Sequence, residues 1–144
     1  RDVLKLPTPD PDRCAVAALY HDASEILTGD LPTPIKYYNP EIKTAYKQVE
    51  RVAGERLLNM LPPELRASYE HDVLEDDEAL APIVKGADKL SAHIKCLEEQ
   101  KAGNTEFDTA ARQTWEAIQA MDRPELNWFV EHCLGAFALN LDQL

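Results

Sequence analysis

The stretch LYHDASEILTGDLPTP, residues 19–34, connects an apolar helical pattern to a polar cluster and then to a proline-rich loop. Upstream of it, Asp10 followed by Pro11 is typical of a helix start, and Gly29 within it is typical of a helix end. The apolar residues between these points recur at helical spacing, which predicts one helix of about 18 residues. The polar cluster is therefore expected in the C-terminal half of a helix that is otherwise half buried.

The polar cluster consists of His21, Asp22 and Glu25. Residues three and four apart share a helix face, so Glu25 is expected one turn beyond both other members. An imidazole nitrogen and a carboxylate oxygen are good ligands for divalent zinc, manganese, cobalt or iron. A carboxylate one turn away is placed to accept a proton from a water activated by the cation, which contributes about 10²–10⁴ in rate. A buried Asp that is neither paired nor bound to a cation would be costly.

The loop after the helix carries another carboxylate, Asp30, followed by Pro32 and Pro34. Two prolines separated by one residue make this segment stiff and extended. In one interpretation the loop is a connector whose Asp caps a turn. In the other, it is a fixed wall that holds the carboxylate over the site, as orientation effects in catalysis require.

Spacing alone does not decide whether two further acidic residues have a functional role or lie on the surface. A second His-Asp pair, His71-Asp72, lies in an acid-rich segment that is typical of a solvated surface, and a His-Asp dipeptide is a weak motif by itself. Asp88 is flanked by Lys85 and Lys89 on a predicted helix, so a surface ion pair explains it as well as a ligand role does.

The remaining chain shows repeated helix signals and no sustained alternation of apolar and polar residues. We expect helices over 40–61, 63–69 and 78–101, and two more whose N-caps are Thr105 and Asp122. This pattern predicts an all-α bundle or orthogonal helical array, with a single domain over residues 1–144.

Composition excludes several classes of function. The chain has 144 residues, 44% hydrophobic and 28% charged, with a net charge of −11, which disfavours nucleic-acid and anionic-membrane partners. No apolar run approaches the roughly 20 residues of a membrane helix, so the soluble cytoplasm is the expected location. The three cysteines, Cys14, Cys96 and Cys133, are far apart and indicate neither a disulfide framework nor a zinc-thiolate site.

The segment YHDASEILTGDLPTPIKYY, residues 20–38, with ADKL at 87–90 and KCLEE at 95–99, resembles the HD-domain phosphohydrolases, in particular the YfbR-like bacterial 5′-deoxynucleotidases. The resemblance extends over nearly the whole chain. It implies an all-α HD fold and a divalent metal such as cobalt, manganese or zinc. It also implies hydrolysis of deoxynucleoside 5′-monophosphates to nucleoside and phosphate. Relatives of this kind suggest a homodimer, and the apolar C-terminal segment would supply surface for it.

The resemblance also implies roles for individual residues. The metal ligands of the family fall on His21, Asp22 and Asp88. Its catalytic acidic residues fall on Glu25 and Asp30. Asp30 and Pro32 are the expected contacts to substrate, with the Pro32 segment forming a wall beside the sugar.

The sequence departs from the family pattern at its start. The family has a further metal His, and a phosphate-binding Arg beside a Trp, on helices ahead of the His-Asp residues. Here thirteen residues precede Cys14, and none is His. We expect these helices to lie outside the sequence, since the catalytic stretch is retained and Arg1 is not a natural start. The other explanation is a form that lacks one ligand and binds metal weakly.

Other functions remain open from the sequence. Another HD phosphohydrolase would act on nucleoside triphosphates or cyclic nucleotides, and a substrate panel separates it. A nucleotide-binding regulatory module would bind ligand without turnover. A purely structural helical protein is the weakest alternative, because it leaves the polar cluster without a role.

Overall fold

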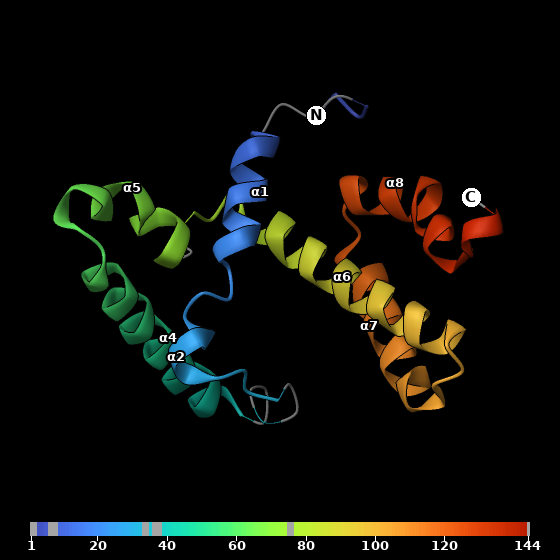
Figure 1. Cartoon of the computed structure of the whole chain (residues 1–144), viewed down its shortest axis with the longest axis horizontal. Helices are drawn as coiled ribbons and strands as arrows, with labels where there is room; N and C mark the ends of the chain where they lie inside the picture. Colours follow the sequence, from blue (N-terminus) through green and yellow to red (C-terminus); the bar gives the residue numbers. More distant parts are fainter. Residues whose placement is uncertain (1–2, 6–8, 33–34, 36–38, 75–76, 144) are drawn as a thin grey trace. The chain divides into compact units, whose positions relative to one another are not determined.

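The structure is a computed structural model, and it describes residues 3–5, 9–32, 35, 39–74 and 77–143 (Figure 1). The described residues form helices, turns and loops and no strand, which confirms the predicted all-α class. Within these ranges, no helix is both long enough and apolar enough to span a lipid bilayer. The chain divides into two compact units, and each is described by itself below. The expected single domain over 1–144 stays a prediction.

The first unit, residues 10–81, contains the polar cluster and is called the His-Asp unit. Its described helices are α1 (Pro11–Tyr20), α2 (Glu25–Thr28), α4 (Pro40–Met60) and α5 (Pro63–Leu74). Helix α5 packs against both α1 and α4, and the single turn of α2 packs against α4. Helix α4 is therefore the long scaffold of this unit, with α2 on one part of its surface and α5 on another.

Helix α4 begins and ends as the sequence predicts. The Asn39 side chain accepts a hydrogen bond from the Ile42 backbone N–H at 2.7 Å, and Pro40 occupies the first helical position. The helix buries Ala53, Gly54 and Leu58. A Cβ atom at Gly54 would lie 3.0 Å from the Leu74 side chain, so this glycine lets α5 approach α4 closely.

Helix α5 differs from the sequence-based expectation. It runs to Leu74 rather than ending near Tyr69, and it carries Asp72 into the interior with a side chain only 5% exposed. The Arg13 Nη2 atom of α1 lies 3.0 Å from Asp72 Oδ1 and compensates the buried carboxylate. The expectation that Asp72 faces solvent is therefore wrong, whereas His71 is exposed.

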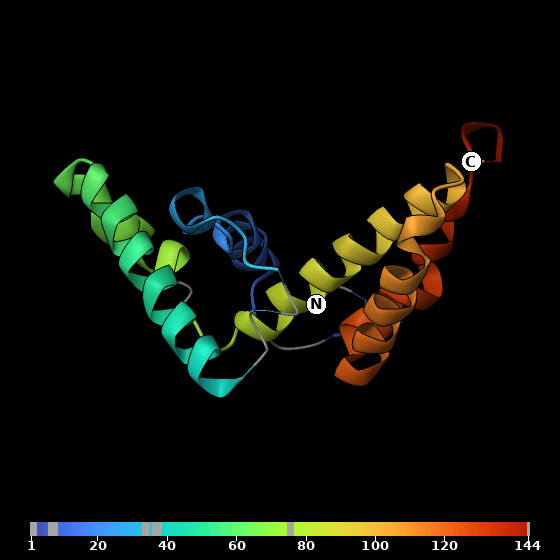
Figure 2. The same ribbon diagram turned by 90° about the horizontal axis from the view of Figure 1, so that it is seen from below.

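The second unit, called the α6–α8 unit, comprises Pro82–Leu144 with the described residues before Asp10. Its elements are α6 (Ala81–Lys101), η1 (Thr105–Phe107), α7 (Asp108–Met121), α8 (Pro124–His132), η2 (Leu134–Ala138) and η3 (Leu141–Gln143). Figures 1 and 2 both show α6 and α7 side by side. Its core is built on the buried side chains of Leu90, Ile118, Leu126 and Leu134.

A buried histidine joins α6 to α7. His93 is 6% exposed, and its Nδ1 atom lies 3.0 Å from Thr114 Oγ1. Burial lowers the pKa of His93, an effect that a hydrogen bond to the Ala111 backbone opposes. The lowered pKa favours a neutral imidazole, which suits a side chain enclosed by the helix pair.

Two predicted N-caps of this unit are wrong by one residue. Asn104, rather than Thr105, accepts from a backbone N–H at the start of η1. Asp122 is the C-cap of α7, with a left-handed φ of 42°, and α8 begins after Arg123. Both errors arise because Asn and Asp stabilise helix ends and turns through several similar local hydrogen bonds.

Candidate metal centre and active site

His21 and Asp22 lie directly after α1, and their side chains converge. His21 Nε2 and Asp22 Oδ2 are 3.1 Å apart. The His21 side chain is 27% exposed and that of Asp22 is 58% exposed, so the pair opens toward solvent on the carboxylate side. The His21 Nδ1 atom lies 2.7 Å from the carbonyl oxygen of Ala18, one turn back on α1. A carbonyl oxygen only accepts hydrogen bonds, so Nδ1 carries a hydrogen.

This geometry fits a divalent cation. With Nδ1 protonated, neutral His21 presents the Nε2 lone pair, and a backbone carbonyl is a common outer partner that orients a metal-binding imidazole. Nε2 and Asp22 Oδ2 then point lone pairs at each other. Two such atoms repel each other at this distance unless a proton or a cation lies between them. Two ligands each about 2.1 Å from one cation are about 3.0–3.4 Å apart at octahedral or tetrahedral angles. The observed separation of 3.1 Å lies in this range.

The chain does not continue from Asp22 to Glu25 as part of one α-helix. Helix α1 ends at Tyr20, residues 21–24 form a turn, and α2 starts at Glu25. The backbone N–H of Glu25 donates to the carbonyl of Asp22 at 2.9 Å, an i to i−3 bond like that of a 3₁₀-helix. The prediction of one helix over about 18 residues is therefore wrong. In this tighter winding, residues three apart share a face, so Glu25 is still on the side of Asp22.

Gly29 is the junction between the two predicted catalytic carboxylates. Its N–H donates to the Glu25 carbonyl at 2.9 Å and closes α2. Its carbonyl oxygen accepts from two hydroxyl groups, Tyr46 Oη of α4 at 2.9 Å and Thr28 Oγ1 at 3.0 Å. Its φ of 71° and ψ of 160° lie in a region that essentially only glycine adopts. Asp30 follows directly, so its position depends on this one glycine.

Replacing Gly29 by Ala tests that dependence. We expect Gly29→Ala to lower the free energy of unfolding by about 1–3 kcal/mol, the usual strain of such a backbone conformation. A Cβ at this position would have no neighbour within 4 Å, so the loss would come from backbone strain and not from a clash. Chemical denaturation measures the change. Gly135→Ala is the matched control, since its Cβ would also meet nothing within 4 Å and its φ is not positive. Equal stability of both variants would contradict the expectation.

The loop beyond Gly29 exposes the predicted substrate contacts. Asp30 and Pro32 are both exposed, and the Pro32 carbonyl accepts a hydrogen bond from the Ile35 N–H at 2.8 Å. Pro34 lies outside the described residues. An exposed carboxylate and an exposed proline ring two residues away suit contact with a small ligand.

Asp88 lies on α6, in the α6–α8 unit. Its Oδ2 atom is 3.1 Å from Lys89 Nζ, and both side chains are partly exposed. An exposed pair of this kind contributes little to stability. Within the described part of the chain, no three His, Cys, Asp or Glu side chains gather as a ready metal site. That Asp88 completes a site with His21 and Asp22 stays a prediction.

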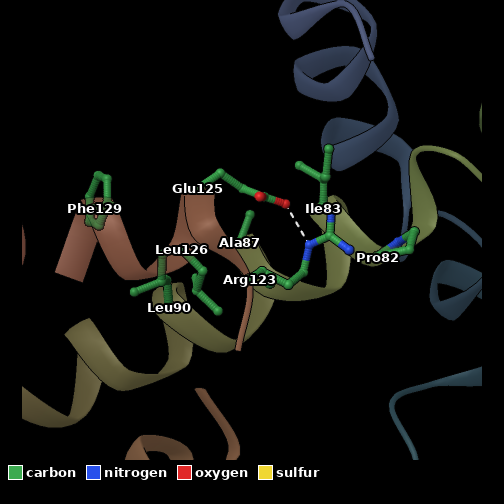
Figure 3. A pocket seen from close by; sticks show the side chains of 9 residues that line it. Pro82, Ile83, Ala87, Leu90, Arg123, Glu125, Leu126 and Phe129 are labelled. Atoms are coloured by element: carbon green, nitrogen blue, oxygen red, sulfur yellow. Dashed lines mark hydrogen bonds and ion pairs between the residues drawn. The ribbon is translucent and has the colours of Figure 1, made fainter. Parts of the chain in front are cut away.

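A separate cavity lies in the α6–α8 unit, between α6 and α8 (Figure 3). It measures about 150 Å³ and has a mostly apolar lining that includes Ile83, Leu90 and Phe129. The charged lining residues, Arg123 and Glu125, pair with each other, as the dashed line in Figure 3 marks. Because the guanidinium is already neutralised, this cavity is poorly suited to a phosphate dianion. None of the predicted site residues lines it.

Sequence reasoning missed the role of Tyr46. The apolar periodicity of its helix assigns this ring to the packing face. In the structure the ring is half buried, and its hydroxyl reaches Gly29, seventeen residues earlier. The available signal was the hydroxyl itself, since a partly buried Tyr usually finds a polar partner. Spacing could not show which partner.

Comparison with known proteins gives a consistent result. A family model described as 5′-deoxynucleotidase YfbR-like matches residues 4–137. A 5′-deoxynucleotidase of Shewanella oneidensis is 44% identical over 139 residues, covering 95% of this chain and 71% of that protein. A 5′-deoxynucleotidase of Erwinia tasmaniensis is 47% identical over 137 residues, covering 94% of this chain and 69% of that protein. A 5′-deoxynucleotidase of Vibrio parahaemolyticus is 44% identical over 142 residues, covering 95% of this chain and 72% of that protein.

Proposed function

The chain belongs to the YfbR-like 5′-deoxynucleotidase family, and from this membership and the His21–Asp22 geometry we propose that it hydrolyses deoxynucleoside 5′-monophosphates with a divalent cation. The products are a deoxynucleoside and inorganic phosphate. The observation that carries the cation assignment is the 3.1 Å approach of His21 Nε2 to Asp22 Oδ2, with Nδ1 held by the Ala18 carbonyl.

The local charge explains why a cation is needed. Asp22, Glu25 and Asp30 are three carboxylates within nine consecutive residues, and together they would repel a phosphate dianion. His21 and Asp22 would hold the cation, with Asp88 as a further ligand. A divalent cation in such a site offsets phosphate charge and makes water nucleophilic near neutral pH. Manganese, cobalt and zinc all suit mixed nitrogen and oxygen ligands.

The two remaining carboxylates handle protons in this proposal. Glu25 takes the proton from the attacking water as the water oxygen bonds to phosphorus. The bond between phosphorus and the 5′ oxygen breaks, and the 5′ oxygen leaves as a hydroxyl group. Asp30 assists that departure, by donating the proton or by orienting the water that does. The fixed turn at Gly29 supports this arrangement because both carboxylates keep a constant backbone relation.

Selection for deoxyribose is assigned to the loop after Asp30. The Pro32 ring is rigid, and its segment is tied by the hydrogen bond from Ile35. A stiff wall beside the second carbon of the sugar would exclude the additional hydroxyl of a ribonucleotide by contact.

Phosphate release tests the proposed function. The purified chain is incubated with manganese or cobalt and a panel of deoxynucleoside monophosphates, ribonucleoside monophosphates, nucleoside triphosphates and cyclic nucleotides. We expect release mainly from deoxynucleoside 5′-monophosphates, abolished by EDTA and restored by excess manganese or cobalt. Preferred turnover of triphosphates or cyclic nucleotides, or turnover that survives EDTA, would overturn the proposal.

A further inference from the structure

The hydrogen bond between Tyr46 and Gly29 links a long helix to the loop that carries Asp30. Tyr46 Oη lies 2.9 Å from the Gly29 carbonyl oxygen, and α2 packs against α4 at this point (Figure 1). Thr28 also approaches the same oxygen, but its hydroxyl has a second acceptor within reach, the Ser24 carbonyl at 3.4 Å. Tyr46 is thus the contact that fixes this carbonyl from another element.

Holding the Gly29 carbonyl in place also sets the backbone position of Asp30. The peptide group between Gly29 and Asp30 is planar, so the direction of the carbonyl also sets the direction of the Asp30 N–H and Cα atom. The Gly29 N–H is meanwhile bonded to the Glu25 carbonyl at 2.9 Å. One residue therefore carries both restraints, one toward Glu25 and one toward α4.

Helix α4 is a suitable anchor for this purpose. Its first turn is capped by Asn39, and its C-terminal half contains its buried residues, with Gly54 closely approached by Leu74 of α5. Tyr46 lies between these two restrained regions. A site held by a packed helix keeps its geometry better than one held by a loop alone.

We infer that Tyr46 is a positioning residue for the proposed reaction, whose hydroxyl holds the Gly29–Asp30 peptide so that Asp30 keeps a constant place relative to Glu25. The inference rests on the proposed function, which gives both carboxylates their roles. Tyr46 does not touch the reacting atoms in this scheme. It acts only through Asp30.

The test is a double-mutant cycle of Tyr46→Phe and Asp30→Asn, measured as phosphate release from a deoxynucleoside 5′-monophosphate with manganese. One hydrogen bond to a neutral partner corresponds to about a 2- to 10-fold loss, so we expect Tyr46→Phe to lower kcat by that factor while KM changes less than about 2-fold. In the Asp30→Asn background, Tyr46→Phe should change kcat by less than about 1.5-fold. Tyr69→Phe is the matched control, since that ring packs edge-on against Tyr20 in the same unit.

The outcomes separate the inference about Tyr46 from the proposed role of Asp30. If Tyr46→Phe lowers kcat by the same factor with and without Asp30, the residue is merely structural and the inference is overturned. If Asp30→Asn retains full activity, the proposed role of Asp30 fails, and the inference fails with it. If the chain shows no turnover, hydrogen exchange tests the contact between Tyr46 and Gly29 instead. Tyr46→Phe must then speed amide exchange at residues 29–31, Tyr69→Phe must not, and equal exchange in both would overturn the inference.

Discussion

His21→Ala should abolish tight cation binding and lower kcat/KM by at least about 10³-fold. A divalent cation contributes several kcal/mol of charge stabilisation in the transition state, and each 1.36 kcal/mol corresponds to a factor of ten. His21 contributes the nitrogen donor, and its Nδ1 contact with the Ala18 carbonyl orients the ring toward Asp22. Titration calorimetry with manganese measures binding, and phosphate release measures turnover.

The second His-Asp dipeptide supplies the control for this prediction. His71 precedes Asp72 just as His21 precedes Asp22, but Asp72 is buried and paired with Arg13, while His71 is exposed. We therefore expect His71→Ala to leave manganese binding and turnover unchanged. Undiminished manganese affinity in His21→Ala would contradict the cation assignment, whatever happens to activity.

Glu25→Gln should lower kcat by about 10²–10⁴-fold, the usual contribution of a positioned general base. The amide keeps the size of the side chain but does not accept a proton. Because His21 and Asp22 remain in place, manganese affinity should stay within about 2-fold of the wild type, on the view that Glu25 is not a direct ligand. Parallel titration calorimetry and phosphate release separate the two effects.

A control is needed because Glu25 also lies in the first turn of a helix. A carboxylate there stabilises the helix by about 0.3–1 kcal/mol through the helix dipole. Glu41 occupies the first turn of α4 in the same unit, so Glu41→Gln removes a comparable interaction without touching the site. Loss of manganese binding in Glu25→Gln would identify Glu25 as a ligand instead of a base. An unchanged kcat would end its assigned role.

Several features of the fold followed from local sequence. The Asn39-Pro40 start of α4 and the end of α6 before Gly103 lie where local chemistry places them, because a cap or a glycine stop acts within a few residues. The His21–Asp22 pair is adjacent in the chain, so its convergence also required no long-range contact. The division of the 11–28 segment into two helices was not predictable, because apolar spacing does not distinguish an α-helical turn from a 3₁₀-like one.

Apolar periodicity could not predict contacts between segments that are far apart in the chain. Arg13 meets Asp72 although the two are far apart in the chain, which turned a predicted surface carboxylate into a buried one. Tyr46 likewise belongs to the apolar pattern of its own helix, and packing of α2 on α4 brings its hydroxyl within hydrogen-bonding distance of the Gly29 carbonyl.

The sequence by itself determined the helical class, the family and the set of candidate site residues, because helix caps, apolar periods and a conspicuous His-Asp-x-x-Glu pattern are local properties. Tertiary structure alone decided that Arg13 neutralises Asp72 and that Tyr46 holds the Gly29 carbonyl. Those outcomes depend on how helices pack against each other, and a hydrogen bond or ion pair forms only where packing brings its two partners within reach.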